Sequence, residues 1–214
     1  MNSKEYFENQ IENIDKSTII PPNLNNDKEK GNITKIKFEI KKTEINKFCK
    51  IKFIPANALF LSSTILALNN LNDCDETLIY YEDNIPFVSK IKSKDITIKD
   101  FLNNTKSQIN ENEEYKNYPI NSLLNEHDLK PEFYYSFNES LKNPSEITYS
   151  NYLNINDDYE NIIISFFYND ALYTEEYIKI FLKNIGKIIN QIITCKIDEM
   201  NIGGIEIDKN MINE

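Results

Sequence analysis

The sequence predicts an α/β fold, an α+β sandwich in which helices cover a mixed sheet of five or six strands. Segments with the two-residue alternation of strands interleave with segments that carry helical stripes along the 214 residues. Hydrophobic residues make up 40% of the chain, which is enough for a sizeable core. Because no internal repeat or composition shift marks a boundary, we expect one domain, with a helix and loop at 1–32, a core lobe at 33–202 and a tail at 203–214.

The first elements are a short helix and a half-exposed strand. Aromatic and apolar residues recur at helical spacing over residues 4–14, and residues 21–32 have the composition of a loop. From Ile36 to Ile40 apolar residues alternate with Lys37 and Glu39. One face of this strand is therefore polar, as in a strand at the edge of a sheet.

A buried helix and two short strands follow. Residues 56–70 are apolar nearly all round and follow Pro55, which favours a helix start, so we expect a helix enclosed by other elements. The longest apolar segment, 56–68, is too short to cross a bilayer, which takes about 20 residues. Residues 77–81 and 86–91 are expected to form strands.

The next segment predicts an amphipathic helix, a short helix and an aromatic strand. Thr97 and Asp100 form a capping pattern in front of an apolar stripe that reaches Ile109. Residues 120–126, after a proline, are expected to be a short helix, and the aromatic residues of 132–138 favour a strand.

The last segment predicts a hairpin and a long helix. Residues 147–155 and 161–168 are joined through NDDYE, and the second arm, IIISFFY, is apolar on both faces, as expected of a central strand. Thr174 caps a helix with two glutamates in its first turn, where they favour the positive end of the helix dipole. Its apolar stripe runs to Ile193.

Composition excludes several classes of partner and location. A net charge of −10 without a concentrated lysine face argues against nucleic acid as a partner. The N-terminus has charges throughout and no apolar core, so it is not a secretory signal. Three separated cysteines, Cys49, Cys74 and Cys195, suggest reduced thiols, and we expect a soluble cytoplasmic protein without a membrane partner.

The residues do not declare a reaction. His127 is the single histidine of the chain, and its place between a short helix and a loop predicts a solvated connector rather than a catalytic base or a metal ligand. The carboxylate pairs Asp157–Asp158 and Glu113–Glu114 are interpreted as solvated charge runs, and Gly203–Gly204 as a turn after a helix. Because phosphate-loop, dinucleotide, zinc-protease and serine-hydrolase motifs are absent from the sequence, we assign no catalytic, cofactor-binding or metal residue.

The order of the elements and several local sequences resemble the C-terminal lobe of the condensation domain of nonribosomal peptide synthetases. The similarity covers nearly the whole chain and lies in the collinear order of four stretches. These are EYFENQIENIDKSTIIPPN, NALFLSSTILALNNLNDCDETLIYY, NIPFVSKIKSKDITIKDFLNNTKSQINENEEYKNYPINSLL and SFFYNDALYTEEYIKIFLKNIGKIINQI. The resemblance implies one lobe of the fold of chloramphenicol acetyltransferase, within an acyltransferase superfamily.

The sequence also departs from the family. The family's catalytic signature, HHxxxDG, belongs to the N-terminal lobe and has no counterpart here. The family's loop that carries an arginine and bridges towards the other lobe joins the strands matching TLIYY and IPFVSKIK, and only residues 82–85 stand in its place.

The resemblance implies a partial or degenerate condensation domain associated with nonribosomal peptide synthesis in secondary metabolism. Such a truncated lobe would not form an amide bond alone and would act as a structural or docking element. The alternative is half of a split condensation or acyltransferase enzyme that a separate lobe bearing HHxxxDG completes. Expected partners are a peptidyl carrier protein, which would bring the phosphopantetheine cofactor, a complementary N-terminal lobe, or a second copy of the chain.

Two further expectations can be checked on the fold. A third hypothesis is that the chain is an unrelated small-molecule-binding α/β domain. In that case the structure would show a closed pocket of about 300 Å³ or more. A missing second lobe would leave an apolar face of roughly several hundred Å², which a monomer seldom tolerates, so we expect either dimerisation or polar residues on that face.

Overall fold

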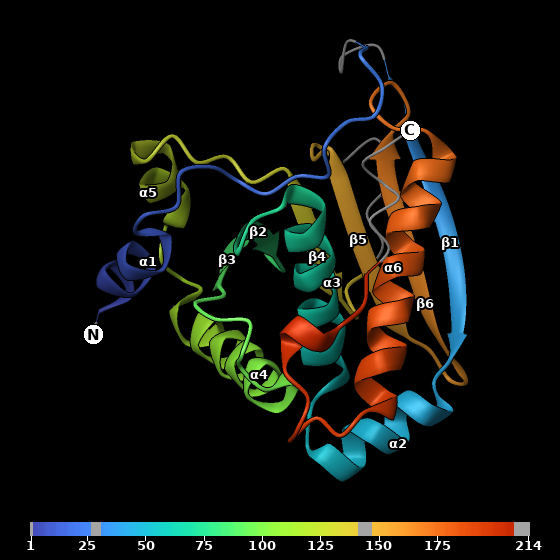
Figure 1. The fold of residues 1–214 in the computed structure, drawn as a ribbon. Helices are drawn as coiled ribbons and strands as arrows, with labels where there is room; N and C mark the ends of the chain where they lie inside the picture. The colour runs from blue at the N-terminus through green and yellow to red at the C-terminus, as the bar shows by residue number, and fades with distance from the viewer. Residues whose placement is uncertain (1, 27–30, 141–146, 208–214) are drawn as a thin grey trace.

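The computed structural model describes residues 2–26, 31–140 and 147–207. One mixed sheet has the strand order β1-β6-β5-β4-β2-β3 (Figure 1). Strand β4 is parallel to β2 and β5, and the other neighbouring strands are antiparallel. The strands are β1 (Ile33–Lys41), β2 (Glu76–Tyr81), β3 (Ile85–Lys90), β4 (Phe133–Phe137), β5 (Asn151–Asp157) and β6 (Asn161–Asn169). The predicted fold class is confirmed.

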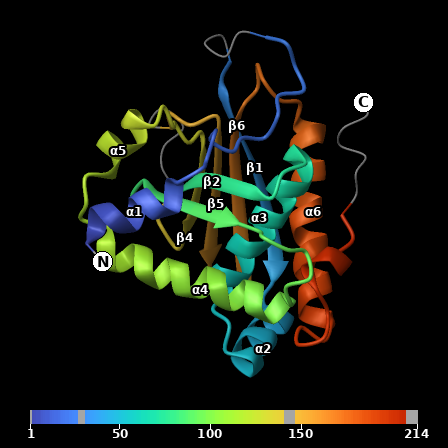
Figure 2. The same ribbon diagram turned by 60° about the vertical axis from the view of Figure 1, so that its left-hand side comes forward.

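Helices cover the two faces of the sheet unequally. One face carries α3 and α6 side by side, with α4 next to α3 (Figure 2). The helices α1 and α5 pack on the opposite face at the β2–β3 end, where Leu78 and Val88 face them. The helices are α1 (Ser3–Ile11), α2 (Thr43–Lys52), α3 (Ala56–Asn72), α4 (Ile98–Tyr115), α5 (Ile120–Glu126) and α6 (Glu175–Thr194).

Helix α3 is enclosed by the rest of the lobe, as its apolar composition predicts. Every residue from Ala58 to Asn69 is buried. Its hydroxyl groups find partners inside: Ser62 donates to the Thr105 hydroxyl of α4 at 2.9 Å, and Ser63 donates to the carbonyl of Leu59 at 2.8 Å. Because these two hydroxyl groups are hydrogen-bonded, their burial between α4, α6 and the sheet costs little free energy.

The two predicted strand roles at this end of the sheet are confirmed. Strand β6 is central, since β1 pairs with one side of it and β5 with the other. Strand β1 is an edge strand with exposed Lys35, Lys37 and Glu39 on its outer face. The hairpin between β5 and β6 is also as predicted.

Helix α2 was not predicted from the sequence. Only Ile45 and Phe48 of this helix are buried, and Lys42 at its start provides no side-chain cap, so neither a stripe nor a capping signal was present. The helix ends at Lys52, and the next residue, Phe53, has a φ of 57°, in the left-handed region.

The predicted start of β5 was wrong: the prediction placed it at residue 147, and the strand begins at Asn151. Tyr149 leaves the ladder and stacks on Tyr134 with ring centroids 4.8 Å apart. Ser150 is held by its hydroxyl contact to Glu132.

The predicted C-terminal turn is present, and the tail is described in part. The 3₁₀ turn η3 (Ile202–Gly204) contains the adjacent glycines, and the Gly203 N–H donates to the carbonyl of Lys94 at 3.0 Å. Residues 208–214 of the predicted tail lie outside the described residues.

Four large apolar side chains are exposed in the described part of the chain, and of these only Phe38 lies on the sheet. Phe38 lies in β1, Ile51 and Phe53 lie at the end of α2, and Tyr159 lies in the β5–β6 turn. The oligomeric state stays a prediction.

Candidate functional site

A polar cluster lies where β2 and β4 end, beside the start of α3. Because β2 and β4 are parallel, their carboxyl ends meet at one edge of the sheet, where open α/β sheets bind ligands. Tyr81 and Glu82 come from the end of β2, Tyr135 comes from β4, and Asn57 comes from the first turn of α3. We call these four residues the tyrosine–glutamate cluster.

Asn57 links the two tyrosines of the cluster. Its Nδ2 donates to the Tyr81 hydroxyl oxygen at 2.7 Å, and the Tyr135 hydroxyl donates to its Oδ1 at 3.1 Å. The two tyrosine rings stack with centroids 6.0 Å apart and an interplanar angle of 14°. The side-chain amide therefore fixes both hydroxyl groups at the sheet edge.

Glu82 is held by the backbone of β4. Its Oε1 accepts a hydrogen bond from the Phe137 N–H at 3.1 Å, and its own N–H donates to the Tyr135 carbonyl at 3.1 Å. Desolvation by burial raises the pKa of Glu82 to about 7, with a smaller contribution from the negative charge of Glu139. The hydrogen bond from Phe137 lowers this pKa without cancelling the effect of burial.

This arrangement can hold a proton near neutral pH. A carboxyl group with a pKa close to the working pH can accept or donate a proton in general acid–base chemistry. Burial raises the pKa of Tyr81 and Tyr135, so their hydroxyl groups stay neutral donors. The cluster offers proton transfer and hydrogen bonding to a polar ligand, without an activated nucleophile among its four residues.

A tight turn follows Glu82 and sets the position of the cluster. The N–H of Ile85 donates to the Glu82 carbonyl at 3.0 Å, and Asp83 and Asn84 have φ values of 53° and 60°. Left-handed conformations at both central residues are typical of the type I′ hairpin turn, which favours aspartate and asparagine. The β2–β3 connection is therefore short, with only residues 82–84 between the two strands.

Sequence reasoning missed Glu82 as a functional candidate and named it only as part of a shortened loop. The available signal was a carboxylate directly after an apolar strand, TLIYY. This carboxylate becomes a candidate only because β2 pairs in parallel with β4, which lies more than 50 residues away in the chain. No local sequence pattern shows that pairing.

The structure places His127 where the sequence predicted. It is exposed at the C-terminal end of α5, and its backbone N–H donates to the Leu123 and Leu124 carbonyls at 3.3 and 3.2 Å. The residue is a helix-terminal connector.

The two carboxylate pairs are surface groups. Asp157 accepts an ion pair from Lys42 at 2.9 Å, and Glu113 accepts one from Lys116 at 2.8 Å. Both pairs lie at exposed positions. Their interpretation as solvated charges is confirmed.

The three cysteines are partly buried free thiols. Desolvation raises the pKa of each, and that of Cys49 reaches about 11. Because the thiolate is the reactive form, burial makes these thiols poor nucleophiles.

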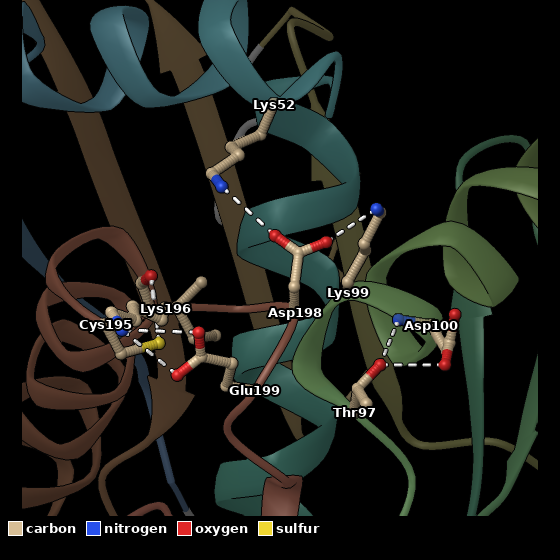
Figure 3. Close-up of polar contacts among 9 residues, drawn as sticks. Lys52, Thr97, Lys99, Asp100, Cys195, Lys196, Asp198 and Glu199 are labelled. Carbon is tan, nitrogen blue, oxygen red and sulfur yellow. Dashed lines mark hydrogen bonds and ion pairs between the residues drawn. The ribbon is translucent and has the colours of Figure 1, made fainter.

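A second polar group connects the chain after α6 to the end of α2 and the start of α4. Asp198 accepts hydrogen bonds from Lys99 at 2.6 Å and from Lys52 at 3.3 Å (Figure 3). The hydrogen bond from Lys99, followed by that from Lys52, lowers the pKa of Asp198. Since Asp198 is exposed, we interpret this group as two surface ion pairs that join α2 and α4 to the segment after α6.

The described residues 2–26, 31–140 and 147–207 contain no group of three or more histidine, cysteine or acidic side chains suited to hold a metal ion. Over the same residues, no single helix has the length and apolar composition of a membrane span. Helices α2 and α3 meet these two criteria only when they are taken together, and a bend of 103° separates them. Two cavities of about 430 and 630 Å³ are open grooves, so neither is the closed pocket expected of a small-molecule-binding domain.

Comparison with solved structures identifies the fold. A four-domain nonribosomal peptide synthetase bound to AMP and glycine superposes with a TM-score of 0.78 and 12% identity, over 94% of this chain and 20% of that one. The X-domain in complex with OxyB from teicoplanin biosynthesis superposes with a TM-score of 0.76 and 9% identity, over 95% of this chain and 55% of that one. The chain has the fold of a condensation-domain lobe.

A third structure supports the same conclusion. The starter condensation domain of rhizomide synthetase superposes with a TM-score of 0.72 and 8% identity, over 96% of this chain and 54% of that one. The chain thus spans about half the length of these isolated domains. No protein-family model and no curated protein matches the sequence.

Proposed function

We propose that this condensation-type lobe is a structural or docking element of a peptide-synthetase assembly and does not form an amide bond by itself. The type I′ turn between β2 and β3 carries the proposal. In the family that the sequence resembles, the bridge towards the other lobe starts at this connection, and here residues 82–84 stand in its place. The sequence also lacks the HHxxxDG signature that the family uses for catalysis.

A related use of the same fold supports a docking role. The X-domain of teicoplanin biosynthesis, which superposes on this chain over 95% of its residues, occurs in a complex with OxyB. By analogy, this chain would bind a carrier protein or another domain of the assembly in the cytoplasm. The phosphopantetheine would belong to the carrier partner.

The test is a condensation assay with purified components. Donor and acceptor carrier proteins, both loaded with aminoacyl groups, are incubated with the chain, and products are followed by mass spectrometry. We expect carrier binding in a pull-down but no peptide product, whereas a two-lobed condensation domain with an intact HHxxxDG motif gives product under the same conditions. Peptide formation by this chain alone would overturn the proposal.

One observation favours a second function, half of a split condensation or acyltransferase enzyme. Glu82 has a pKa of about 7 at the sheet edge from which the family's bridge would start, so it could share in proton transfer once another lobe covers it. Mixing the chain with a separate lobe that bears HHxxxDG should then restore activity, and Glu82→Gln should shift the pH profile of that activity. Failure of the two lobes to bind would exclude this function.

A further inference from the structure

An apolar groove runs between helix α6 and edge strand β1, at the edge of the sheet that lies away from β2 and β3 and the tyrosine–glutamate cluster. Its volume is about 630 Å³, and Ile164, Ile180 and Leu182 contribute to its lining. Phe38 and Ile40 contribute from β1, and Phe38 keeps 38% of its surface exposed. An exposed phenylalanine in an apolar groove is a favourable contact site for another apolar side chain.

The groove lies beside the open edge of the sheet. Within the described part of the chain β1 pairs only with β6, so its other side presents backbone N–H and C=O groups without a strand partner. Figure 1 shows α6 running alongside β1 at this edge. An edge strand with a parallel helix next to it is the geometry that accepts an added peptide strand.

Gly186 keeps the helix side of the groove open. It lies in the interior of α6 and lines the groove, and a Cβ atom built there meets nothing within 4 Å. Glycine within a helix is less favourable than alanine. Packing inside the chain does not require glycine at this position, and its effect is to leave room for an outside group.

The charge of this edge indicates the chemistry of the partner. The outer face of β1 has three lysines, Lys35, Lys37 and Lys41, against Glu39, although the whole chain has a net charge of −10. At the rim, exposed Lys179 and Lys183 of α6 add positive charge and exposed Glu176 adds one negative charge. Two copies paired along β1 would bring like charges together, whereas a strand with acidic side chains would gain opposite-charge pairs.

We propose that this groove binds an extended acidic segment of a partner protein, which adds a strand to β1. Alternate apolar side chains of the segment fill the groove under α6, and the acidic side chains between them lie beside the lysines of β1. The proposal concerns a different surface from the tyrosine–glutamate cluster and does not depend on the function proposed above.

The test uses a fluorescent peptide of alternating valine and glutamate with the length of β1, nine residues, and the full chain. Fluorescence anisotropy should show saturable binding that weakens as salt is raised. A peptide with lysine in place of glutamate should bind at least about tenfold more weakly. Methylation of the backbone nitrogens that face β1 should abolish binding, because it removes the strand hydrogen bonds.

Variants of Gly186 separate groove binding from general charge attraction. Gly186→Phe fills the groove and should weaken binding by about tenfold or more, whereas Gly186→Ala should keep the wild-type affinity within about threefold. Circular dichroism spectra should show that both variants fold, since a Cβ at this position meets no neighbour.

Three outcomes would overturn the proposal. The first is no binding of the acidic peptide by the wild-type chain, and the second is equal binding by the wild-type and Gly186→Phe chains. The third is a wild-type chain that sediments as a dimer and becomes a monomer in the Gly186→Phe variant, because a second copy would then occupy the groove.

Discussion

Replacing Glu82 with glutamine should stabilise the protein above neutral pH and have little effect in mild acid. The pKa of Glu82 rises from an ordinary value of 4.5 to about 7, chiefly because burial disfavours the charged form. Stability contributed by the protonated carboxyl is fully present below pH 4.5 and is lost as the pH rises through about 7. A neutral glutamine does not pay this penalty, and its carbonyl oxygen can still accept the hydrogen bond from Phe137.

The magnitude follows from the two pKa values. Their separation of about 2.5 corresponds to about 3 kcal/mol for a fully buried group. Glu82 is only partly buried, so solvent screening should reduce the gain to about 1–2 kcal/mol. The free energy of unfolding of Glu82→Gln should exceed that of the wild type by this amount at alkaline pH.

Urea unfolding followed by circular dichroism at about pH 5 and about pH 8.5 measures the effect through the shift in midpoint. The matched control is Asp83→Asn, a substitution of the neighbouring carboxylate in the same turn, which should change stability far less because this side chain is exposed. Equal gains at both pH values, or a loss of stability at the higher one, would refute the assignment of Glu82 as a buried titrating group.

Three other substitutions test the fold and the assignments. Leu59→Ala, at a fully buried position of α3, should lower the free energy of unfolding by about 2–5 kcal/mol in urea titrations. The control Ile51→Ala, at a 60% exposed position, should lower it by far less. Similar values for both variants would contradict the burial of α3. Asp83→Val should destabilise by about 1–2 kcal/mol because a β-branched residue resists positive φ, with Asp83→Gly tolerated; equal midpoints would argue against the left-handed turn. His127→Ala should leave thermal stability and carrier binding unchanged, and loss of either would show that the exposed histidine has a role.

The elements with strong local patterns were predictable from the sequence. Thr97 and Thr174 cap their helices as the capping patterns indicated, each accepting a hydrogen bond from a backbone N–H of the first turn. The apolar run of β6 marked it as the central strand, because a strand covered on both faces has no polar side. These features depend on residues close together in the chain.

The candidate site was not predictable in the same way. Asn57, Tyr81 and Tyr135 meet because β2 pairs in parallel with β4 and α3 packs on both, and such pairing depends on the whole fold. The raised pKa of Glu82 likewise depends on burial contributed by distant segments. Helix α2 was not predicted because its two buried side chains are too few to define an amphipathic stripe.

The pairing of β1 with β6 has a consequence for how the chain folds during synthesis. Ile33 lies opposite Asn169 and Lys41 opposite Asn161, so strand β1 leaves the ribosome more than 100 residues before its partner. Non-local pairing of this kind is slow because a long loop must close first. Until β6 emerges, the segment ITKIKFEIK has no strand to pair with, and its lysines help to keep it from aggregating with other nascent chains.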